Sequence, residues 1–437
     1  MRSDDFTLIP KDLPDRDRGM FPPFNHIYDI KYLIDDQDNL RCSLGENKCE
    51  GNAMEGLPNT MWQPAVEVGF VDEVRRFVKH RIVPLANEID AKDLYPAEIV
   101  RDLAKLGCNA ISLPKKFGGR ELGYAHSVAA CEEIGYGSAA VAICLITIFQ
   151  AQTMLNTFGS ESLKQRYLPQ FAEGLIASYA LTEASHGSDI RRLDTKAHRD
   201  GDAWVLNGEK SFITSGSRAE VFVILAQTDI GVSVFVVPRE CAGVSTYVGE
   251  NSATFGLRNG PHVNVRLQDV RLPLDHLVGQ EGKGVRQAVT TLDYSRTLAA
   301  GISVGIARAA FDAALVFARD RTAFDQKVVN FQGIQWYFAD MLAKIDAARL
   351  LVYEAARALD NHDDVIRRAS AAKLFASEVA TEVAARCVQI CGAYGTMVNA
   401  PFGRFMRDAK TYEIGGGSSE VLKNALAKCV VSYAAEL

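Results

Sequence analysis

The segment Arg407–Val421 reads RDAKTYEIGGGSSEV, and three consecutive glycines separate two helical patterns there. Glycine has no Cβ, so it accepts positive φ angles and lets another group approach the backbone closely. Ser418 and Ser419 provide N-cap oxygens for the second helix, and Glu420 suits its first turn. A glycine turn before a helix N-terminus is a natural binding site for a phosphate, but it is also an ordinary helix–helix connection. The remainder of the chain has to distinguish these two interpretations.

The composition is that of a globular protein without a nucleic-acid or membrane partner. The 437 residues are enough for two or three domains, and 48% of them are hydrophobic and 23% charged. The net charge is −6, and the Lys and Arg residues are scattered rather than clustered. Nine cysteines without paired spacing are typical of thiols in a reducing compartment, so no metal site is expected. Because the N-terminus lacks an apolar leader and the apolar run Ala139–Phe149 is too short to span a bilayer, we expect a cytoplasmic protein.

Hydrophobic periodicity divides the chain into four parts. Residues 1–63 are rich in Pro, Asp and Asn, which predicts an irregular N-terminal extension. Apolar residues recur every three or four positions over 64–176, which predicts an α-helical domain. Residues 177–280 hold short β-rich segments between Gly, Asn and Asp, which predicts a small β-barrel or sandwich. Long helices return over 281–437 and fit a four-helix bundle closed by the helix after the triple glycine, so the fold class is α+β.

Five motifs resemble those of the acyl-CoA dehydrogenases, in that family's order and spacing. They are YALTEASHGSD (179–189), NGEKSFITSG (207–216), DRTAFDQKVVNFQGIQWYFADM (320–341), QICGAYGT (389–396) and RDAKTYEIGGGSSEV (407–421). The resemblance implies an FAD-containing homotetramer with an N-terminal helical domain, a middle β-barrel domain and a C-terminal four-helix bundle. It also implies an acyl thioester substrate, carried by CoA or an acyl carrier protein, and an electron-transfer flavoprotein as partner.

The resemblance assigns contacts with FAD to residues in all five motifs. A hydroxyl can hydrogen-bond a flavin edge, an aromatic face can pack on the ring, and an arginine fork suits a pyrophosphate. The residues expected at the flavin and ribityl region are Tyr179, Leu181, Thr182, Gly187, Ser188, Phe212 and Thr214. Those expected at the adenine and pyrophosphate, partly in a neighbouring subunit, are Arg321, Phe324, Gln332, Gln389, Gly392, Gly395, Ser418 and Glu420. The family pattern is broken at Ala184, which replaces a proline, at His186, which replaces a small residue, and at Asp325, which replaces a glycine.

The catalytic base of the family is missing from both positions where members carry it. The family's chemistry removes the α-proton of an acyl thioester with a carboxylate, while the β-hydrogen leaves as hydride to the flavin. Most members carry this Glu eight residues after the Asp of the RDAK pattern, which is Gly416 in this chain. Other members carry it before the Arg of an LD.ER pattern, and LDYSR places Ser295 there, followed by Arg296. A serine has no useful basicity near neutral pH without a partner base.

Three explanations of the missing base stay open. The first is another acid, for which Asp293, Glu413 and Glu420 are the nearest candidates in sequence. The second is a lyase-type elimination, as in the desulfinases of this fold, although no Arg stands near Ala139, where those enzymes bind a distal anion. The third is a flavin monooxygenase; ordinary α,β-dehydrogenation remains the preferred class. The residues expected to contact substrate are Ser188, Asp293, Arg296 and Gly415.

Overall fold

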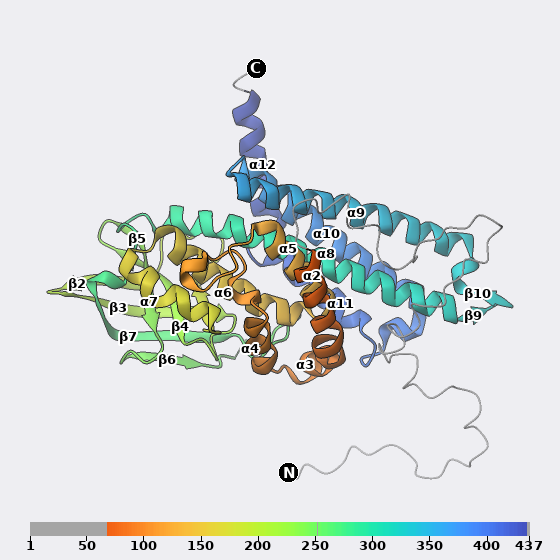
Figure 1. The fold of residues 1–437 in the computed structure, drawn as a ribbon, viewed down its shortest axis with the longest axis horizontal. Helices are drawn as coiled ribbons and strands as arrows, with labels where there is room; N and C mark the ends of the chain where they lie inside the picture. The colour runs from red at the N-terminus through yellow and green to blue at the C-terminus, as the bar shows by residue number, and fades with distance from the viewer. Residues whose placement is uncertain (1–67, 251, 435–437) are drawn as a thin grey trace, which may run out of the picture. The chain divides into compact units, whose positions relative to one another are not determined.

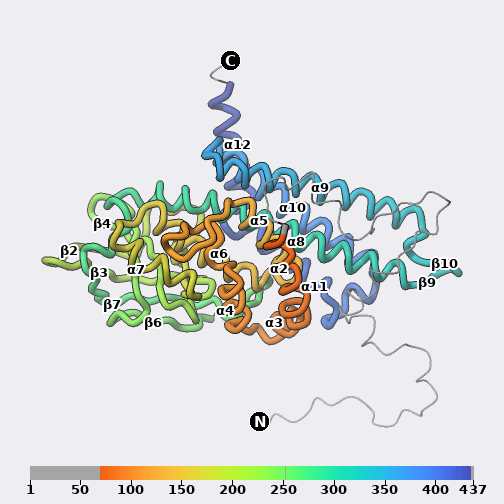
Figure 2. The backbone as a smooth tube through the Cα atoms, viewed as in Figure 1, coloured from red at the N-terminus to blue at the C-terminus, as the bar shows by residue number. Residues whose placement is uncertain are grey.

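The computed structural model describes residues 68–250 and 252–434 (Figure 1). The irregular extension expected over 1–63 lies outside these described residues. Helices come first, strands follow and helices return, and Figure 2 traces this order along the backbone. The first helices are α2 (Val68–Phe77), α3 (Ala86–Lys92), α4 (Ala97–Lys105), α5 (Tyr124–Gly137), α6 (Ala139–Phe158) and α7 (Glu161–Ala172).

An eight-stranded sheet follows α7. Its strands are β1 (Ala177–Ala180), β2 (Lys196–Asp200), β3 (Ala203–Ile213), β4 (Val221–Thr228), β5 (Gly231–Pro238), β6 (Val244–Tyr247), β7 (Val263–Pro273) and β8 (Leu277–Val278). The strand order is β6-β7-β3-β2-β4-β5-β8, and β1 pairs in parallel with β4. The sequence patterns missed β2 and β8. β2 reads KAHRD and buries only Ala197, while β8 has two residues, so neither shows a run of alternating apolar residues.

One hydrophobic core joins the two halves of this sheet. Trp204 of β3, Phe222 of β4, Phe235 of β5 and Val265 of β7 are buried in the same cluster. The rings of Trp204 and Phe235 meet edge to face, with their centroids 5.1 Å apart. Because β3 and β7 lie on one side of β2 in the strand order and β4 and β5 on the other, the sheet curves over its own core.

Five helices and a short hairpin complete the chain. They are α8 (Gly284–Asp320), the hairpin β9 (Thr322–Ala323) and β10 (Gln326–Lys327), α9 (Gln332–Asn361), α10 (Val365–Cys391), α11 (Phe402–Ile414) and α12 (Ser419–Ala434). α10 packs against α8, α9, α11 and α12. The helix that completes the packing on both α8 and α10 is α11, so the expectation that the helix after the triple glycine closes the bundle is wrong. The reason is that Phe405, Ala409 and Tyr412 form one buried face of α11, whereas α12 buries only Ser419 and Leu422 and points away from the bundle in Figure 1.

Helices α5 and α8 cross at very short range because glycines lie at their contact. A Cβ on Gly305 would lie 2.2 Å from the carbonyl oxygen of Glu132, and one on Gly135 would lie 2.9 Å from the carbonyl oxygen of Ile302. Any larger residue at these positions would push the helices apart. Since α5 precedes the sheet in the chain and α8 follows it, this crossing joins the first helical block to the last.

Within residues 68–250 and 252–434, two helices, α6 and α8, have the length and apolar composition that a membrane span needs. α6 continues beyond the apolar run Ala139–Phe149 for about two and a half more turns, to Phe158. In α6, however, 83% of the most apolar window is buried inside the protein, and in α8 the share is 61%. Their apolar side chains therefore form the core of this fold, and their length and composition are only weak evidence for a membrane span.

Candidate active site

Arg296 links the two segments in which the missing base was expected. Ser295 and Arg296 are on α8, and the Arg296 Nε–H donates to the carbonyl oxygen of Gly416 at 3.0 Å. The Arg296 Nη1 atom also lies 2.7 Å from Asp293 Oδ1, and both side chains are buried. Positions 120 residues apart in sequence therefore form one site. The sequence patterns singled out all of these residues.

The glycine segment after α11 has a left-handed backbone. Gly415 closes α11 in an extended conformation, Gly416 has a φ of +71° and Gly417 a φ of +110°. A Cβ built on Gly416 meets no atom within 4 Å, whereas one on Gly417 lies 3.2 Å from Arg296 Nη2. The space beside Gly416 is therefore open, but a residue with a side chain would be strained at this φ.

A second cation binds the same segment, and the sequence patterns missed it. Lys373 of α10 is fully buried, and its Nζ donates to the carbonyl oxygen of Gly417 at 2.6 Å. Burial, together with the nearby Arg296 charge, lowers the pKa of Lys373 to about 8. Two consecutive carbonyls, of Gly416 and Gly417, thus accept hydrogen bonds from cations on two different helices. The available signal was a lone lysine among the small and apolar residues of ASAAKLFAS.

The hydroxyl of Ser295 has no base beside it. It donates to the carbonyl oxygen of Leu292 at 3.0 Å and accepts from Gln150 Nε2 of α6 at 3.2 Å. An amide cannot take up a proton near neutral pH, so these contacts do not activate the serine. Gln150 is another contact that the sequence patterns missed.

The carboxylates proposed as substitute bases already have partners. Burial raises the pKa of Asp293, while its ion pair with Arg296 opposes that shift. Glu413 pairs with Lys410 at 2.6 Å on the same helix. Hydrogen bonds from its own backbone and from Ser418 lower the pKa of Glu420, which is exposed in the first turn of α12. Among the described residues, none of these three acids is an unpaired buried base.

The aromatic residue expected against the flavin is exposed and strained. Phe212 at the end of β3 has 52% of its surface exposed and a φ of +59°. A bulky residue with positive φ is uncommon and points to a functional constraint. Two residues further on, Thr214 Oγ1 lies 3.4 Å from His262 Nε2. Burial lowers the pKa of His262 to about 4, so this imidazole is neutral at pH 7. His262 was missed because a single histidine in a turn gives no pattern.

A buried ion pair fixes the loop of residues 181–188, which carries the other residues expected at the flavin. Lys210 of β3 lies 2.7 Å from Glu183 Oε1, and both side chains are almost completely buried. Burial by itself would raise the pKa of Glu183, but the Lys210 charge and its hydrogen bonds lower it. Lys210 also donates to the carbonyl oxygen of Leu181, and the Thr182 carbonyl accepts from the Ser211 N–H. The loop is thereby attached to β3, with Gly187 and Ser188 exposed.

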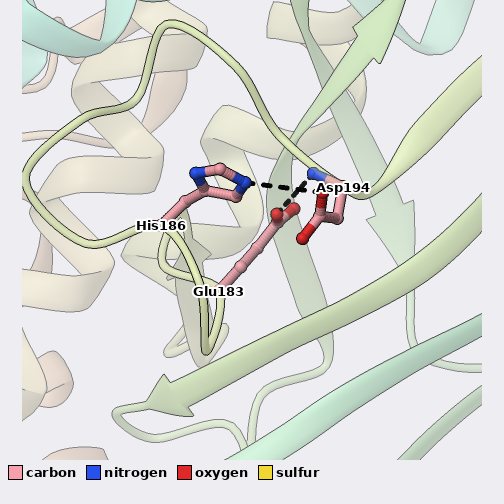
Figure 3. Close-up of side chains that lie close together, drawn as sticks. All are labelled: Glu183, His186 and Asp194. Atoms are coloured by element: carbon pink, nitrogen blue, oxygen red, sulfur yellow. Dashed lines mark hydrogen bonds and ion pairs between the residues drawn. The ribbon is translucent and has the colours of Figure 1, made fainter.

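Figure 3 shows a cluster of Glu183, His186 and Asp194 whose side-chain atoms have a spacing suited to a metal. His186 Nε2 lies 3.4 Å from Asp194 Oδ1. However, Glu183 accepts hydrogen bonds from the backbone N–H groups of Asp194 (2.6 Å) and Thr195 (3.0 Å) in addition to Lys210. Because these bonds use both of its carboxylate oxygens, the cluster supports a closed loop rather than a metal centre.

Six of the residues expected at the adenine and pyrophosphate lie at the β9–β10 hairpin, at the start of α9 and at the end of α10. Ser418 and Glu420, the other two, lie at the start of α12, apart from the hairpin in Figure 1. Phe324 has 90% of its surface exposed, and it forms a two-residue turn with Asp325, both with positive φ. Such turns favour Asn-Gly, so Phe-Asp is strained there. The Arg321 guanidinium carbon lies 5.6 Å from the centre of the Tyr394 ring. No carboxylate pairs with Arg321 in the described part of the chain, and Gln332 and Gln389 are exposed.

The two glycines after α10 have different surroundings. Gly392 has a φ of +57°, and a Cβ built on it meets nothing within 4 Å. Gly395 is buried, and its Cβ would lie 2.4 Å from the carbonyl oxygen of Val388, so close packing also explains this glycine. Ser418 accepts from the Val421 N–H at 3.4 Å and is the N-cap of α12, as the sequence predicts.

These residues fit a large cofactor with a flat ring and an anionic linker. Open space lies beside Gly187 and Gly392, two strained aromatic side chains are exposed, and the buried Tyr179 hydroxyl finds no partner among the described residues. The helix–sheet–helix order and this set of residues define the class, a cofactor-dependent enzyme with its site on the β domain and the C-terminal helices.

Three family models match the chain, and together they cover most of it. They are the acyl-CoA dehydrogenase N-terminal domain at residues 66–175, the middle domain at 178–270 and the C-terminal domain at 282–431. A probable acyl-CoA dehydrogenase of Mycobacterium tuberculosis is 36% identical over 369 residues, which is 82% of this chain and 93% of the relative. The chain therefore belongs to the acyl-CoA dehydrogenase family.

Solved structures agree with this assignment. Butyryl-CoA dehydrogenase from Megasphaera elsdenii matches with a TM-score of 0.80 and 31% identity, over 83% of this chain and 97% of the other. A glutaryl-CoA dehydrogenase from Mycobacterium smegmatis in complex with FADH2 matches with a TM-score of 0.80 and 25% identity, over 84% and 96%. Membership of this family makes the protein an FAD-dependent oxidoreductase that acts on CH–CH groups. The N-terminal helical, middle β and C-terminal helical domains that the sequence predicts are confirmed.

Removing Lys210 is expected to loosen the loop of residues 181–188. Lys210→Met leaves the Glu183 carboxylate buried without its cation, which costs about 3–5 kcal/mol of folding free energy. We expect a lower thermal midpoint and faster loss of FAD on dialysis, measured by circular dichroism and flavin absorbance. The matched control is Arg271→Ala, because the pair of Arg271 with Asp200 on the same domain is solvent-exposed. Equal midpoints for both variants would show that the buried pair does not hold the loop.

Proposed function

We propose that the protein acts with FAD at Cα and Cβ of an acyl thioester, carried by CoA or a carrier protein, through a non-standard arrangement of the base. The observation that carries the proposal is the site at Arg296, which binds the Gly416 carbonyl next to Ser295 in the sequence, where none of the three candidate acids of the described chain is an unpaired base. Bound FAD supplies the acceptor for the hydride. Arg296 and Lys373 hold the glycine carbonyls, and Gln150 orients Ser295. An electron-transfer flavoprotein is the proposed partner for re-oxidation.

The missing base also favours two related reactions as alternatives. An elimination that releases a leaving group from the acyl chain, or an oxygenation at the reduced flavin, needs no carboxylate at Gly416 or Ser295. Anaerobic mixing with saturated acyl-CoAs separates them from dehydrogenation. Flavin bleaching means that hydride has left the substrate, while unchanged flavin absorbance across the panel supports the alternatives.

A carboxylate restored at either position is expected to accelerate flavin reduction. A general base contributes about 10²–10⁴-fold, so Ser295→Glu or Gly416→Glu should speed anaerobic bleaching by a saturated acyl-CoA. Gly416→Glu has open space but strain of order 1 kcal/mol from its positive φ, whereas Ser295→Glu must displace the Gln150 contact. Ser295→Gln and Gly416→Gln are the controls of equal size. If both glutamate variants fold, keep FAD and reduce no faster than their controls, the dehydrogenase proposal is wrong.

Arg321 is proposed to pair with the cofactor pyrophosphate. Arg321→Ala removes a charge-assisted bidentate contact, which should cost about 2–5 kcal/mol of cofactor binding. The variant is expected to lose FAD on dialysis, measured as the ratio of flavin to protein absorbance. Arg319→Ala is the nearby control, since Arg319 pairs with Asp320 on the same helix. Equal retention of FAD by both variants would remove Arg321 from the cofactor site.

We propose a homotetramer, with the adenosine half of FAD at a subunit boundary. Apolar side chains are exposed along α9 and α12, and such a surface is more typical of an interface than of a free face. They are Trp336, Tyr337, Leu342, Leu350 and Leu351 on α9, and Val430, Val431 and Tyr433 on α12. Sedimentation equilibrium is expected to give four times the chain mass of 47.8 kDa. A monomer that holds one FAD per chain would contradict this assembly.

A further inference from the structure

Thr214 and His262 face each other where β3 ends and β7 begins. The last pair of these antiparallel strands is Ile213 with Val263, so Thr214 and His262 are the next two residues in register. Thr214 Oγ1 lies 3.4 Å from His262 Nε2. Hydrogen bonds at functional sites are often long before a ligand binds and shorten when it does. The register of the sheet therefore brings a hydroxyl and an imidazole together.

Hydrogen bonds to the backbone restrain both residues. The Ser178 hydroxyl of β1 donates to the Thr214 carbonyl oxygen at 2.6 Å. The His262 N–H donates to the carbonyl oxygen of Ser252 at 3.2 Å. Thr214 also lies two residues after Phe212, the strained aromatic residue that is expected against the flavin. The pair is thus held at the end of β3, where the sequence resemblance places the cofactor.

The His262 ring is neutral at pH 7 and has one hydrogen to donate. Burial lowers the pKa of His262 to about 4, although the negative charge of Asp93 acts in the opposite direction. A neutral imidazole carries one N–H donor and one acceptor nitrogen. Among the described residues, Thr214 is the only hydrogen-bond partner of the ring. The position of the ring hydrogen therefore decides whether Thr214 accepts or donates in this contact.

The two arrangements of this contact have different consequences for Thr214. With the hydrogen on Nε2, His262 donates to Thr214 Oγ1, and the threonine hydrogen is free to point to another group. With the hydrogen on Nδ1, Thr214 donates to His262 and has no hydrogen left for a second acceptor. The polar edge of an oxidised flavin consists mainly of carbonyl oxygens and ring nitrogens that accept hydrogen bonds. Only the first arrangement lets Thr214 donate to them.

We propose that His262 is a positioning residue for the flavin: its Nε2–H donates to Thr214 Oγ1, and the Thr214 hydroxyl donates to the flavin edge. This inference rests on the FAD-dependent part of the proposed function and on the flavin contact expected for Thr214. The first hydrogen bond polarises the hydroxyl and strengthens the second. A donor aimed at an atom that gains negative charge stabilises the reduced flavin more than the oxidised one. His262 therefore raises the reduction potential of the bound FAD.

Spectroelectrochemical titration of the holoenzyme without substrate tests the proposal. His262→Phe keeps a flat ring but has no N–H, so the preference of the protein for reduced over oxidised FAD should fall about three- to tenfold. For a two-electron couple, a tenfold fall is a midpoint potential lower by about 30 mV. His262→Gln keeps an amide N–H with a similar reach and should stay within about twofold of the wild type. The flavin absorption bands should shift in His262→Phe and not in His262→Gln.

A double-mutant cycle with Thr214→Val shows whether the effect passes through the threonine. Thr214→Val alone should lower the potential, and His262→Phe should then cause no further change, because its donor has no acceptor left. His198→Phe is the matched control and should leave the potential unchanged, since His198 is an exposed histidine of β2 in the same domain. Thermal midpoints are measured for every variant, and His262→Leu replaces His262→Phe if the latter does not fold.

The inference is overturned if His262→Phe leaves the potential unchanged, if His262→Gln shifts it equally, or if the shifts add in the double variant. A wild-type potential in Thr214→Val overturns it too and removes Thr214 from the flavin site. None of these results bears on the acyl thioester, because no substrate is present. Anaerobic bleaching by acyl-CoAs tests that part of the proposed function separately, so the two failures are distinguishable.

Discussion

The structure depends on a buried ionic cluster where α5 meets α8. Arg308 of α8 lies 2.7 Å from Glu132 and 3.2 Å from Glu133 of α5. Arg75 of α2 reaches Glu133 and Arg349 of α9 reaches Glu132, each at 3.2 Å. Two buried carboxylates therefore hold together four helices that come from both ends of the described chain. Buried charges stabilise the folded state only when their ion pairs have good geometry. The cluster therefore favours the one packing of these helices in which all the pairs form.

Buried cations also fix the backbone of the glycine segment. Left-handed Gly416 and Gly417 are kept in place by Arg296 and Lys373, whose donors occupy the carbonyls that a helix would otherwise satisfy. The glycine segment therefore forms an ordered structure with its own hydrogen bonds. Glycine is required in this segment because Gly416 and Gly417 adopt φ angles that residues with side chains avoid.

Much of this arrangement could be predicted from sequence, because the periodic segments bury one face and the motifs keep their spacing. The order of helices and strands was predicted in this way, and the motifs singled out Asp293, Ser295, Arg296 and Gly416 before their contacts were known. β2 was missed because its exposed residues show no alternation, and α12 was misplaced because its pattern does not reveal which apolar face finds a partner. Lys373 and His262 were missed since burial of a single polar residue depends on tertiary contacts.

The order of α5 and α8 in the chain determines when their crossing can form during synthesis. The partners Glu132 and Arg308 are 176 positions apart, and the whole β sheet is made between them. At roughly 5–20 residues per second, α5 waits about 10–35 seconds for α8. Until then Glu132 and Glu133 lack Arg308, so the crossing of α5 and α8 can form only after the sheet has been synthesised.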